Sequence, residues 1–388
     1  MKKGTLLLLW LGAAISISEI FTGGLIAPLG LAKGLGAILI GHLIGTGLLT
    51  LGGYVSFCRK EAAMESVAFS LGSRGGALAA FCNVVQLTGW TVVMVVQAGS
   101  ALTGFLPDIP FRLLALILSA LVLVWALIFG SPAARINEAA VCLLAILCLV
   151  LFFEAASGGM SAASGDMSMV LAIELSIAMP ISWLPLAGDY ARRAETKGAA
   201  VLMPFIGYFA GSVLMYGFGL FIGLSSGGNG DIFSFITASR FRLAACFVVL
   251  LSTLTTAFLD LYSAAVSSGH LVKTKNERTP ILIIGLIAVL ISVFFPMEKY
   301  GLFLENFLLA IGSVFVPIYT ILFIDFFLKR PRHEKPFRLP ALGIALSGII
   351  GYHLFNRFNI WIPTVMTILL VALLYTLVIL LPVRLKRR

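Results

Sequence analysis

Trp10 to Gly24 read WLGAAISISEIFTGG and lie inside an apolar run, Thr5–Leu31, in which Glu19 is the only charged residue. About 20 apolar residues span the hydrocarbon of a bilayer, so this run is long enough to cross a membrane. A carboxylate at the centre of a span costs roughly 2.5–3.5 kcal/mol on insertion scales and usually faces a protein interior. Ser, Thr and Gly around it disfavour a regular helix. The stretch predicts a broken membrane helix that lines a binding site, and the alternative is a Glu hydrogen-bonded to a neighbouring helix.

The composition predicts a membrane protein over the whole chain. Of the 388 residues, 60% are hydrophobic and 11% are charged, and the mean hydropathy is +1.06. A soluble domain has roughly 25% charged residues. The net charge of +10 comes from basic residues scattered in short loops, so it does not indicate nucleic-acid binding. The five cysteines contain no CxxC pair, which predicts neither a disulfide framework nor a zinc site.

Hydropathy divides the chain into about twelve membrane-spanning stretches. Their approximate limits are 5–31, 35–57, 77–105, 111–130, 136–157, 168–188, 199–225, 242–269, 280–296, 301–328, 339–355 and 360–382. With a cytoplasmic N-terminus, the outer side holds few of the 27 Lys and Arg residues: Lys33, Arg112, Arg240, Arg242, Lys299 and Arg357. This bias follows the positive-inside rule. We expect an all-helical, polytopic protein of the cell (inner) membrane with both termini in the cytoplasm.

The sixth predicted span contains a second interruption. Pro180 and Pro185 flank Ser182 and Trp183, and each proline removes a backbone donor, so the helix should kink or open near Met179–Trp183. Spans one and six each begin a block of five helices. Interrupted spans at matching positions of two inverted halves point to a transporter's substrate site. The predicted single domain, 1–388, therefore consists of a first repeat (5–157), a second repeat (168–328) and two extra helices (339–382).

Two further spans carry polar stripes. In the third, Asn83, Gln86, Trp90 and Gln97 fall on one helical face. Amides in membranes also bridge helices, and we assign Gln86 and Trp90 to a site for a flat ring and the other two to helix contacts.

In the eighth span, Ser252, Thr255, Thr256 and Asp260 offer hydroxyls and a carboxylate on adjoining turns. Such oxygens, joined by carbonyl groups of an unwound helix, suit a sodium ion.

Other polar residues indicate less. His42 is predicted to be packed or hydrogen-bonded, and Asp189, followed by Arg192 and Arg193, is expected in a surface ion network. Gly207 and Gly211, and likewise Gly219 and Gly223, have the spacing of closely packed helices. The chain lacks a Gly-Lys-Ser/Thr phosphate loop, HExxH and GxSxG, which argues against an ATPase or a hydrolytic enzyme. A channel is disfavoured because no charged ring or filter-like segment is found.

Several of these motifs resemble the nucleobase–cation symporter family. The resemblance covers nearly the whole chain and rests on Trp10–Glu19 with Thr22-Gly23-Gly24, Gln86–Trp90, Gly188–Arg192, and Thr255-Thr256 with Leu261–Ser263. It is greatest to the CytX-type branch of permeases for hydroxymethylpyrimidine, a thiamine precursor, and next to cytosine permeases. The family implies the LeuT-type fold, with five-plus-five inverted repeats and two C-terminal helices, and transport of a small molecule by sodium or proton symport.

The resemblance places the substrate between spans one, three, six and eight and the cation between spans one and eight. The predicted substrate-binding residues are Glu19, Ser16, Ser18, Gln86, Trp90, Ser182, Trp183 and Asp260. The predicted sodium ligands are Thr255, Thr256, Ser252 and Ala14, the last through its carbonyl group. No other cofactor is expected, and the protein should act as a monomer in the bilayer. Met94 stands where hydantoin transporters carry a Gln, which predicts a different substrate.

The carboxylate of Glu19 indicates which of the family's substrates this chain would bind. A carboxylate accepts from the amino group of a 4-aminopyrimidine and, when either partner is protonated, shares a second bond with the ring nitrogen. Uracil presents a different order of donors and acceptors. We therefore expect secondary active uptake of hydroxymethylpyrimidine, and the alternative is cytosine or another nucleobase.

Overall fold

The computed structural model describes residues 1–128, 131–157, 166–225, 235, 237–272, 278–297 and 300–381, and in these ranges the regular secondary structure is helical. The first helices are α1 (Lys3–Ala14), α2 (Ile17–Leu25), η1 (Ala27–Leu29), α3 (Gly30–Arg59), α4 (Ala63–Leu71), α5 (Ser73–Phe105), α6 (Phe111–Ile128) and α7 (Ser131–Ala156). The next are α8 (Met169–Ser182), α9 (Leu184–Ala191), α10 (Lys197–Ser225), α12 (Arg242–Val272), α13 (Arg278–Val293) and α14 (Tyr300–Phe327). The last are α15 (Leu339–Arg357), α16 (Pro363–Tyr375) and η3 (Thr376–Leu380).

These helices make a multi-pass membrane protein. In the described ranges, ten helical stretches are long and apolar enough to cross a membrane, and α1 and α13 are shorter apolar helices. Every predicted span contains a described helix. Lys299 and the last residues of the spans predicted at 111–130 and 360–382 lie outside the described residues.

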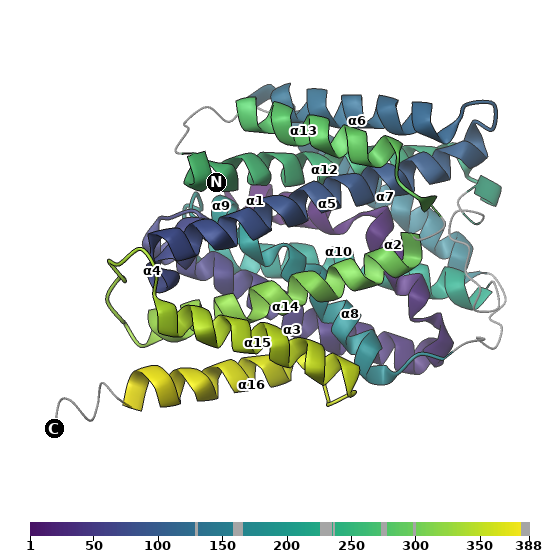
Figure 1. Cartoon of the computed structure of the whole chain (residues 1–388). Coiled ribbons are helices and arrows are strands. Elements are labelled where there is room, and N and C mark those ends of the chain that lie inside the picture. Colours follow the sequence, from purple (N-terminus) through teal and green to yellow (C-terminus); the bar gives the residue numbers. More distant parts are fainter. Residues whose placement is uncertain are drawn as a thin grey trace.

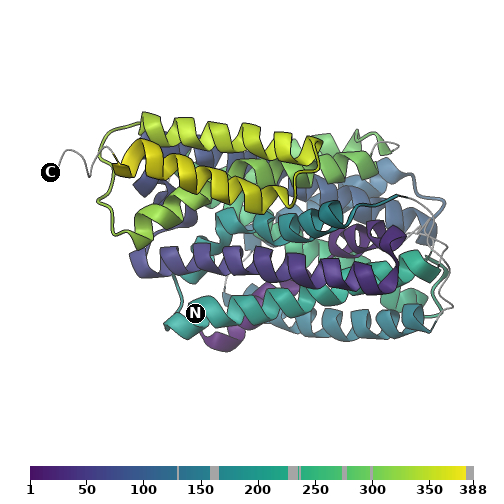
Figure 2. The same ribbon diagram turned by 90° about the horizontal axis from the view of Figure 1, so that it is seen from below.

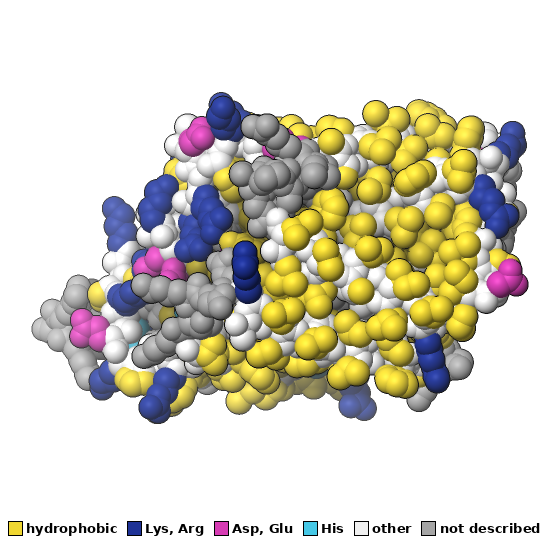
Figure 3. Space-filling model, turned by 90° about the horizontal axis from the view of Figure 1, so that it is seen from above, with side chains coloured by type: hydrophobic (Ala, Val, Ile, Leu, Met, Phe, Trp, Pro, Cys, Tyr) yellow, Lys and Arg dark blue, Asp and Glu magenta, His cyan; other side chains and the backbone are white. Residues whose placement is uncertain are grey.

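Most helices run along one direction of the molecule, and α1 begins and α16 ends toward the same end (Figure 1). Figure 3 shows a band of apolar side chains between charged ends, with Lys and Arg gathered at the end where α1 begins. The segregation of charge suits a bilayer around the middle of the bundle.

The first predicted break is confirmed, but it precedes Glu19. Ile15 and Ser16 adopt extended backbone between α1 and α2. The Ser16 hydroxyl accepts from the backbone N–H of Glu19 (3.3 Å), which caps α2. Gly23, which we associated with the break, lies inside α2 instead. A Cβ atom there would lie 2.2 Å from the Tyr216 carbonyl oxygen, so Gly23 permits close packing against α10.

The second break lies where the prolines predict it. Helix α8 contains Pro180 and ends at Ser182, Trp183 forms the junction, and Pro185 lies in the first turn of α9. Proline supplies no N–H to the helical ladder, which is why the ladder ends here.

Each broken helix packs against an unbroken one. Helix α10 lies along α1 and α2, α3 lies along α8 and α9, and α5 packs against α12. The glycine spacing predicted for close packing on α10 is confirmed. At Gly219 a Cβ atom would lie 1.8 Å from the Ile20 carbonyl oxygen.

The C-terminal helices α15 and α16 lie side by side on the outside of this core (Figures 1 and 2). A buried carboxylate on α8 fixes both of them. Glu174 accepts from the Tyr352 hydroxyl of α15 (2.7 Å) and from the backbone N–H and hydroxyl of Thr364 on α16 (3.0 and 2.5 Å). This charged residue ties distant segments together.

A second carboxylate holds the same helices at the other end of α16. Asp325 on α14 accepts from the Arg338 guanidinium (2.5 Å) and from the Tyr375 hydroxyl. Arg338 also donates to the carbonyl oxygen of Ser70 (3.2 Å), which joins α4 to the group.

Gly219→Ala should destabilise the protein by roughly 1–3 kcal/mol, the usual cost of overfilling a packed interface. The added methyl group would force α10 away from α2. Thermal unfolding of the purified protein in detergent measures the effect.

Gly217→Ala on the same helix is the matched control, because the nearest atom to its Cβ would be Phe152 Cε2 at 3.9 Å. This control should be neutral or slightly stabilising, since Ala forms helix better than Gly. Equal unfolding temperatures for the two variants would contradict the close contact at Gly219.

Candidate substrate and cation site

Two hydrogen bonds fix the register between α5 and α12. The Asn83 amide donates to the Ser267 hydroxyl (2.8 Å), and Arg242 donates to the Gly104 carbonyl oxygen (3.3 Å). The residue numbers rise along one helix as they fall along the other, so the helices are antiparallel.

This register brings two predicted site residues to one level. Trp90 follows Asn83 by seven residues, and Asp260 precedes Ser267 by seven. Seven residues make about two helical turns and so restore the face, and in an antiparallel pair the two steps run the same distance in the same direction. Trp90 and Asp260 therefore lie opposite each other in the contact between α5 and α12.

Polar atoms near this level have no hydrogen-bond partner among the described residues: Trp90 Nε1, Asp260 Oδ2 and Gln86 Oε1. The three residues are only 4%, 1% and 3% exposed. A buried polar atom without a partner costs about 1–3 kcal/mol. The unpaired donor and acceptors match what the edge of a heteroaromatic ring offers.

Gln86 links this group to the break in the sixth span. Its amide donates to the Ser182 carbonyl oxygen (2.9 Å) and to Asn83 Oδ1 (2.9 Å). The helix break thus supplies a carbonyl group to the same layer. The prediction that Asn83 forms helix contacts is confirmed.

Aromatic rings surround the junction. Trp183 lies edge to face with Trp10 (6.1 Å between ring centroids) and with Tyr208 (6.4 Å), and Trp90 lies edge to face with Phe307 (5.4 Å). Trp10 is a residue to which sequence reasoning gave no role. Its position one turn before the break in the first span is the signal that could have indicated a role for Trp10.

The predicted sodium ligands belong to two helices that pack against each other, with the Ala14 carbonyl group on α1 and the hydroxyl groups on α12. Helix α1 ends at the buried Ala14 and packs against α12, and the carbonyl groups of a helix's last turn have no partners within the helix. The Thr256 hydroxyl is buried and has no partner among the described residues. Thr255 and Ser252 donate to the Leu251 and Val249 carbonyl oxygens (2.7 and 3.2 Å), which leaves their oxygen lone pairs for a ligand. This donor set suits a hard cation.

Glu19 faces α10. Its Oε1 accepts from the Tyr208 hydroxyl (2.8 Å), and its Oε2 lies 2.5 Å from the Ser212 hydroxyl. These are contacts of the kind that the alternative predicts, a carboxylate hydrogen-bonded to a neighbouring helix. Direct contact between Glu19 and a substrate stays a prediction.

The neighbours of Glu19 have structural partners. Ser16 caps α2, and the Ser18 hydroxyl donates to Gln97 Oε1 and approaches Met94 Sδ (3.5 Å). The assignment of Gln97 to helix contacts is confirmed. Sequence reasoning missed Tyr208 and Ser212, although their four-residue spacing places them on one helical face.

Asp189 is not in a surface ion network, as we expected from the sequence. It is buried, and its Oδ1 accepts from the backbone N–H of Ala63 (3.0 Å) at the start of α4. A helix N-terminus attracts negative charge, which explains the carboxylate there. Arg192 instead pairs with Glu65 (4.0 Å).

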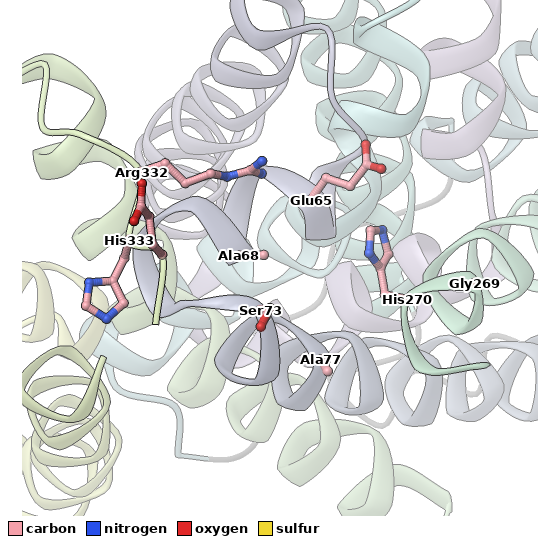
Figure 4. Close-up of a pocket in the computed structure, with 10 residues that line it drawn as sticks. Glu65, Ala68, Ser73, Ala77, Gly269, His270, Arg332 and His333 are labelled. Atoms are coloured by element: carbon pink, nitrogen blue, oxygen red, sulfur yellow. The ribbon is translucent and has the colours of Figure 1, made fainter. Parts of the chain in front are cut away.

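A pocket of about 410 Å³ (Figure 4) lies beside α4, which is toward the end of the molecule where α1 begins (Figure 1). Glu65 and Ala68 of α4, Ser73 and Ala77 of α5, and Gly269 and His270 of α12 line it together with Arg332 and His333. It continues the contact between α5 and α12 beyond Asn83 and Ser267.

Comparison with known proteins assigns the chain to a family. Residues 4–339 match the family model described as permease for cytosine/purines, uracil, thiamine, allantoin. The chain belongs to this family. It is therefore a membrane transporter and not an enzyme, and the resemblance to nucleobase–cation symporters is confirmed.

Relatives agree with this assignment. The chain is similar to the cytosine permease of Escherichia coli strain K12, with 24% identity over 394 residues that cover 95% of this chain and 88% of the permease. Among solved structures it resembles the nucleobase-cation-symport-1 transporter Mhp1 in a closed conformation with bromovinylhydantoin bound. The TM-score is 0.79 at 16% identity, over 97% of this chain and 91% of Mhp1.

The inward-facing conformation of Mhp1 gives a TM-score of 0.77 at 16% identity, over 96% and 89% of the two chains. A Na⁺-coupled sialic acid symporter gives 0.71 at 13% identity, over 96% and 88%. The predicted LeuT-type fold is confirmed.

Proposed function

We propose that this family member is a secondary active transporter of the cell (inner) membrane that imports a nucleobase, with cytosine as the leading candidate, by cation symport and alternating access. The observation that carries the proposal is the set of unpaired polar atoms on Gln86, Trp90 and Asp260 beside the break at Ser182. The basic end in Figure 3, where α1 begins, is the proposed cytoplasmic side.

The chemistry of cytosine suits this set. Its ring edge carries an amino donor, a ring-nitrogen acceptor, a carbonyl acceptor and an N–H donor. Gln86 Oε1 and Asp260 Oδ2 accept from the donors, and the faces of Trp90 and Trp183 cover the ring. Flat rings bind well between aromatic side chains because every base has a π-face.

Hydroxymethylpyrimidine is the second candidate because it also pairs an amino group with a ring nitrogen. The sequence favoured hydroxymethylpyrimidine because Glu19 could pair with its aminopyrimidine edge. In the structure, however, the Glu19 carboxyl group is bound by Tyr208 and Ser212. The likeness to the E. coli cytosine permease favours cytosine. In this proposal Glu19, Ser16 and Ser18 shape the site by holding α2 in place.

The coupling cation in this proposal is sodium at the end of α1. The carbonyl group of Ala14 and the hydroxyls of Thr256, Thr255 and Ser252 are the proposed ligands. Because α1 leads directly into the break before Ser16, a cation there orders the broken helix that faces the substrate.

The pocket in Figure 4 is the proposed release route to the cytoplasm. It lies beyond the layer of Asn83, Ser267 and Gln86, which separates it from Trp90 and Asp260. Inward opening then requires the Asn83–Ser267 hydrogen bond to break.

Labelled cytosine should accumulate in proteoliposomes under an imposed inward sodium or proton gradient. Unlabelled cytosine should compete more strongly than hydroxymethylpyrimidine, and uracil should compete weakly. Failure of cytosine to accumulate under either gradient would overturn the proposal, and stronger competition by hydroxymethylpyrimidine would reverse the order of the candidates.

Trp90→Ala should weaken cytosine binding by roughly 1–3 kcal/mol, the range for a base stacked on an aromatic side chain. Trp90→Phe should recover part of the loss because a ring face remains. Titration calorimetry of the purified variants measures both values. Parent-like affinity of the Ala variant would show that Trp90 only packs against Phe307.

Thr256→Ala should abolish the sodium dependence of cytosine affinity, since it removes the one hydroxyl of this group that has no hydrogen bond to its own helix. Thr320→Ala is the matched control, because that buried hydroxyl donates to the Val316 carbonyl oxygen on α14 (2.8 Å). The cytosine affinity of both variants, measured with and without sodium, tests this prediction. Unchanged sodium dependence in Thr256→Ala would place the cation elsewhere.

A further inference from the structure

Three buried side chains from three helices form a continuous chain of hydrogen bonds. Glu19 Oε2 on α2 lies 2.5 Å from Ser212 Oγ on α10, and Ser212 Oγ lies 2.6 Å from His42 Nε2 on α3. Exposure does not exceed 1% at any of them. We call these residues the triad.

The bonds determine how many hydrogens the triad holds. His42 Nδ1 lies 2.8 Å from the Ile38 carbonyl oxygen, which only accepts, so Nδ1 carries a hydrogen. The two contacts of the Ser212 oxygen each need one hydrogen. The Ser212 hydroxyl supplies one, so the second comes from His42 Nε2 or from Glu19 Oε2.

Two arrangements meet this count. In the first, an imidazolium donates to Ser212, and Ser212 donates to a carboxylate. In the second, a protonated carboxyl group donates to Ser212, and Ser212 donates to a neutral imidazole. Both hold one proton more than a neutral His42 with an ionised Glu19, and both have no net charge.

Loss of that proton breaks a bond. With neutral His42 and ionised Glu19, the single Ser212 hydrogen serves only one of the two contacts. Either α2 separates from Ser212 or α3 does. The occupancy of the triad therefore decides whether Ser212 binds α2 and α3 at the same time, while Tyr208 keeps its own bond to α2.

The surroundings favour the neutral, protonated triad. From α10, the hydroxyl group of Tyr208 donates to Glu19 Oε1, and the Tyr216 ring lies edge to face with the His42 ring, with 4.5 Å between the two centroids. No Lys or Arg is among the buried residues in the described ranges. A lone negative charge here would lack a cationic neighbour, which is costly in a dry interior.

In the described ranges, the other helices packed against the triad bury acids and tyrosines but no Lys or Arg. Helix α12, next to α2, buries Asp260, and α5 contacts α2 through Gln97. Helices α8 and α9, next to α3, bury Glu174 and Asp189, which are bound to residues outside the triad.

We propose that Glu19, Ser212 and His42 form a binding site for one exchangeable proton whose occupancy lets Ser212 of α10 bind the broken helix α2 and α3 at the same time. The site lies one helical turn after the break, so its occupancy bears on the same helix as the proposed sodium site. The use of this proton in transport rests on the proposed function. The binding of the proton does not.

A titration without substrate tests the site directly. The purified protein in liposomes is titrated while the carboxyl and carboxylate bands of Glu19 are followed by infrared absorption and the His42 imidazole by nitrogen-15 resonances. Glu19→Gln and His42→Gln assign the two signals. Both should change over the same pH interval in the parent, because loss of one shared proton alters both bonds.

Ser212→Ala keeps both titratable groups and removes the bridge, so the joint transition should be lost and the two signals should change separately. Glu174→Gln is the control for a buried carboxyl group outside the triad and should leave the joint transition unchanged. Separate transitions in the parent, or a joint transition that survives in Ser212→Ala, would overturn the site.

Glu19→Gln then tests coupling. The Gln amide donates to Ser212 as a protonated carboxyl group does, so this variant imitates the occupied site and keeps every bond. Cytosine uptake by the parent should rise with an inward proton gradient, and that dependence should be lost in Glu19→Gln. A dependence equal to that of the parent would overturn coupling. Absence of cytosine uptake by the parent, with the joint titration intact, would overturn the proposed function and leave the proton site standing.

Discussion

A break in a helix at the centre of a membrane is tolerated only where protein buries the freed backbone groups and supplies their partners. Much of this fold follows from meeting that constraint at Ile15–Ser16. Ser16 caps α2, and α10 covers the broken helix. The cover is close because Gly219 and Gly23 leave room for backbone contact. The break at Trp183 meets the same constraint through α3 and through the Gln86 amide, which binds the freed carbonyl group of Ser182.

The contact between α5 and α12 contains the unpaired polar atoms to which a ligand is proposed to bind. Asn83 and Ser267 satisfy each other and set the register, whereas Trp90 and Asp260, two turns away, keep unpaired polar atoms. The same pair of helices thus has one layer, Asn83 and Ser267, that is hydrogen-bonded, and an unsatisfied layer, Trp90 and Asp260, whose polar atoms lack partners. An unsatisfied layer in a dry interior is unfavourable until a ligand with complementary groups enters it, which gives the protein a free-energy difference between empty and loaded states.

Buried carboxyl groups in this protein differ by their partners and not by their burial. Glu174 and Asp325 accept from side chains of α15, α16 or the segment before α15, and they hold the C-terminal helices on the core. Asp260 has an oxygen without a partner at the proposed substrate level. Glu19 faces a serine that is shared with a histidine. The first two roles are structural, and the last two residues belong to the proposed substrate and proton sites.

The sequence by itself determined the class of protein, its approximate spans and both interruptions, because apolar length, proline and charge bias act locally along the chain. The LeuT-type fold followed from the resemblance of its motifs to a known family. It also placed Gln86, Trp90, Thr256 and Asp260 on faces that the tertiary contacts then bring toward one another. Only the tertiary structure decided that Glu19 binds Tyr208 and Ser212 and that Asp189 is buried at the start of α4. Glu19 and Ser212 are separated by 193 positions. Helical periodicity gives the face of a residue on its own helix, and the partner opposite that face is set by the packing of glycine-lined helices that no local pattern specifies.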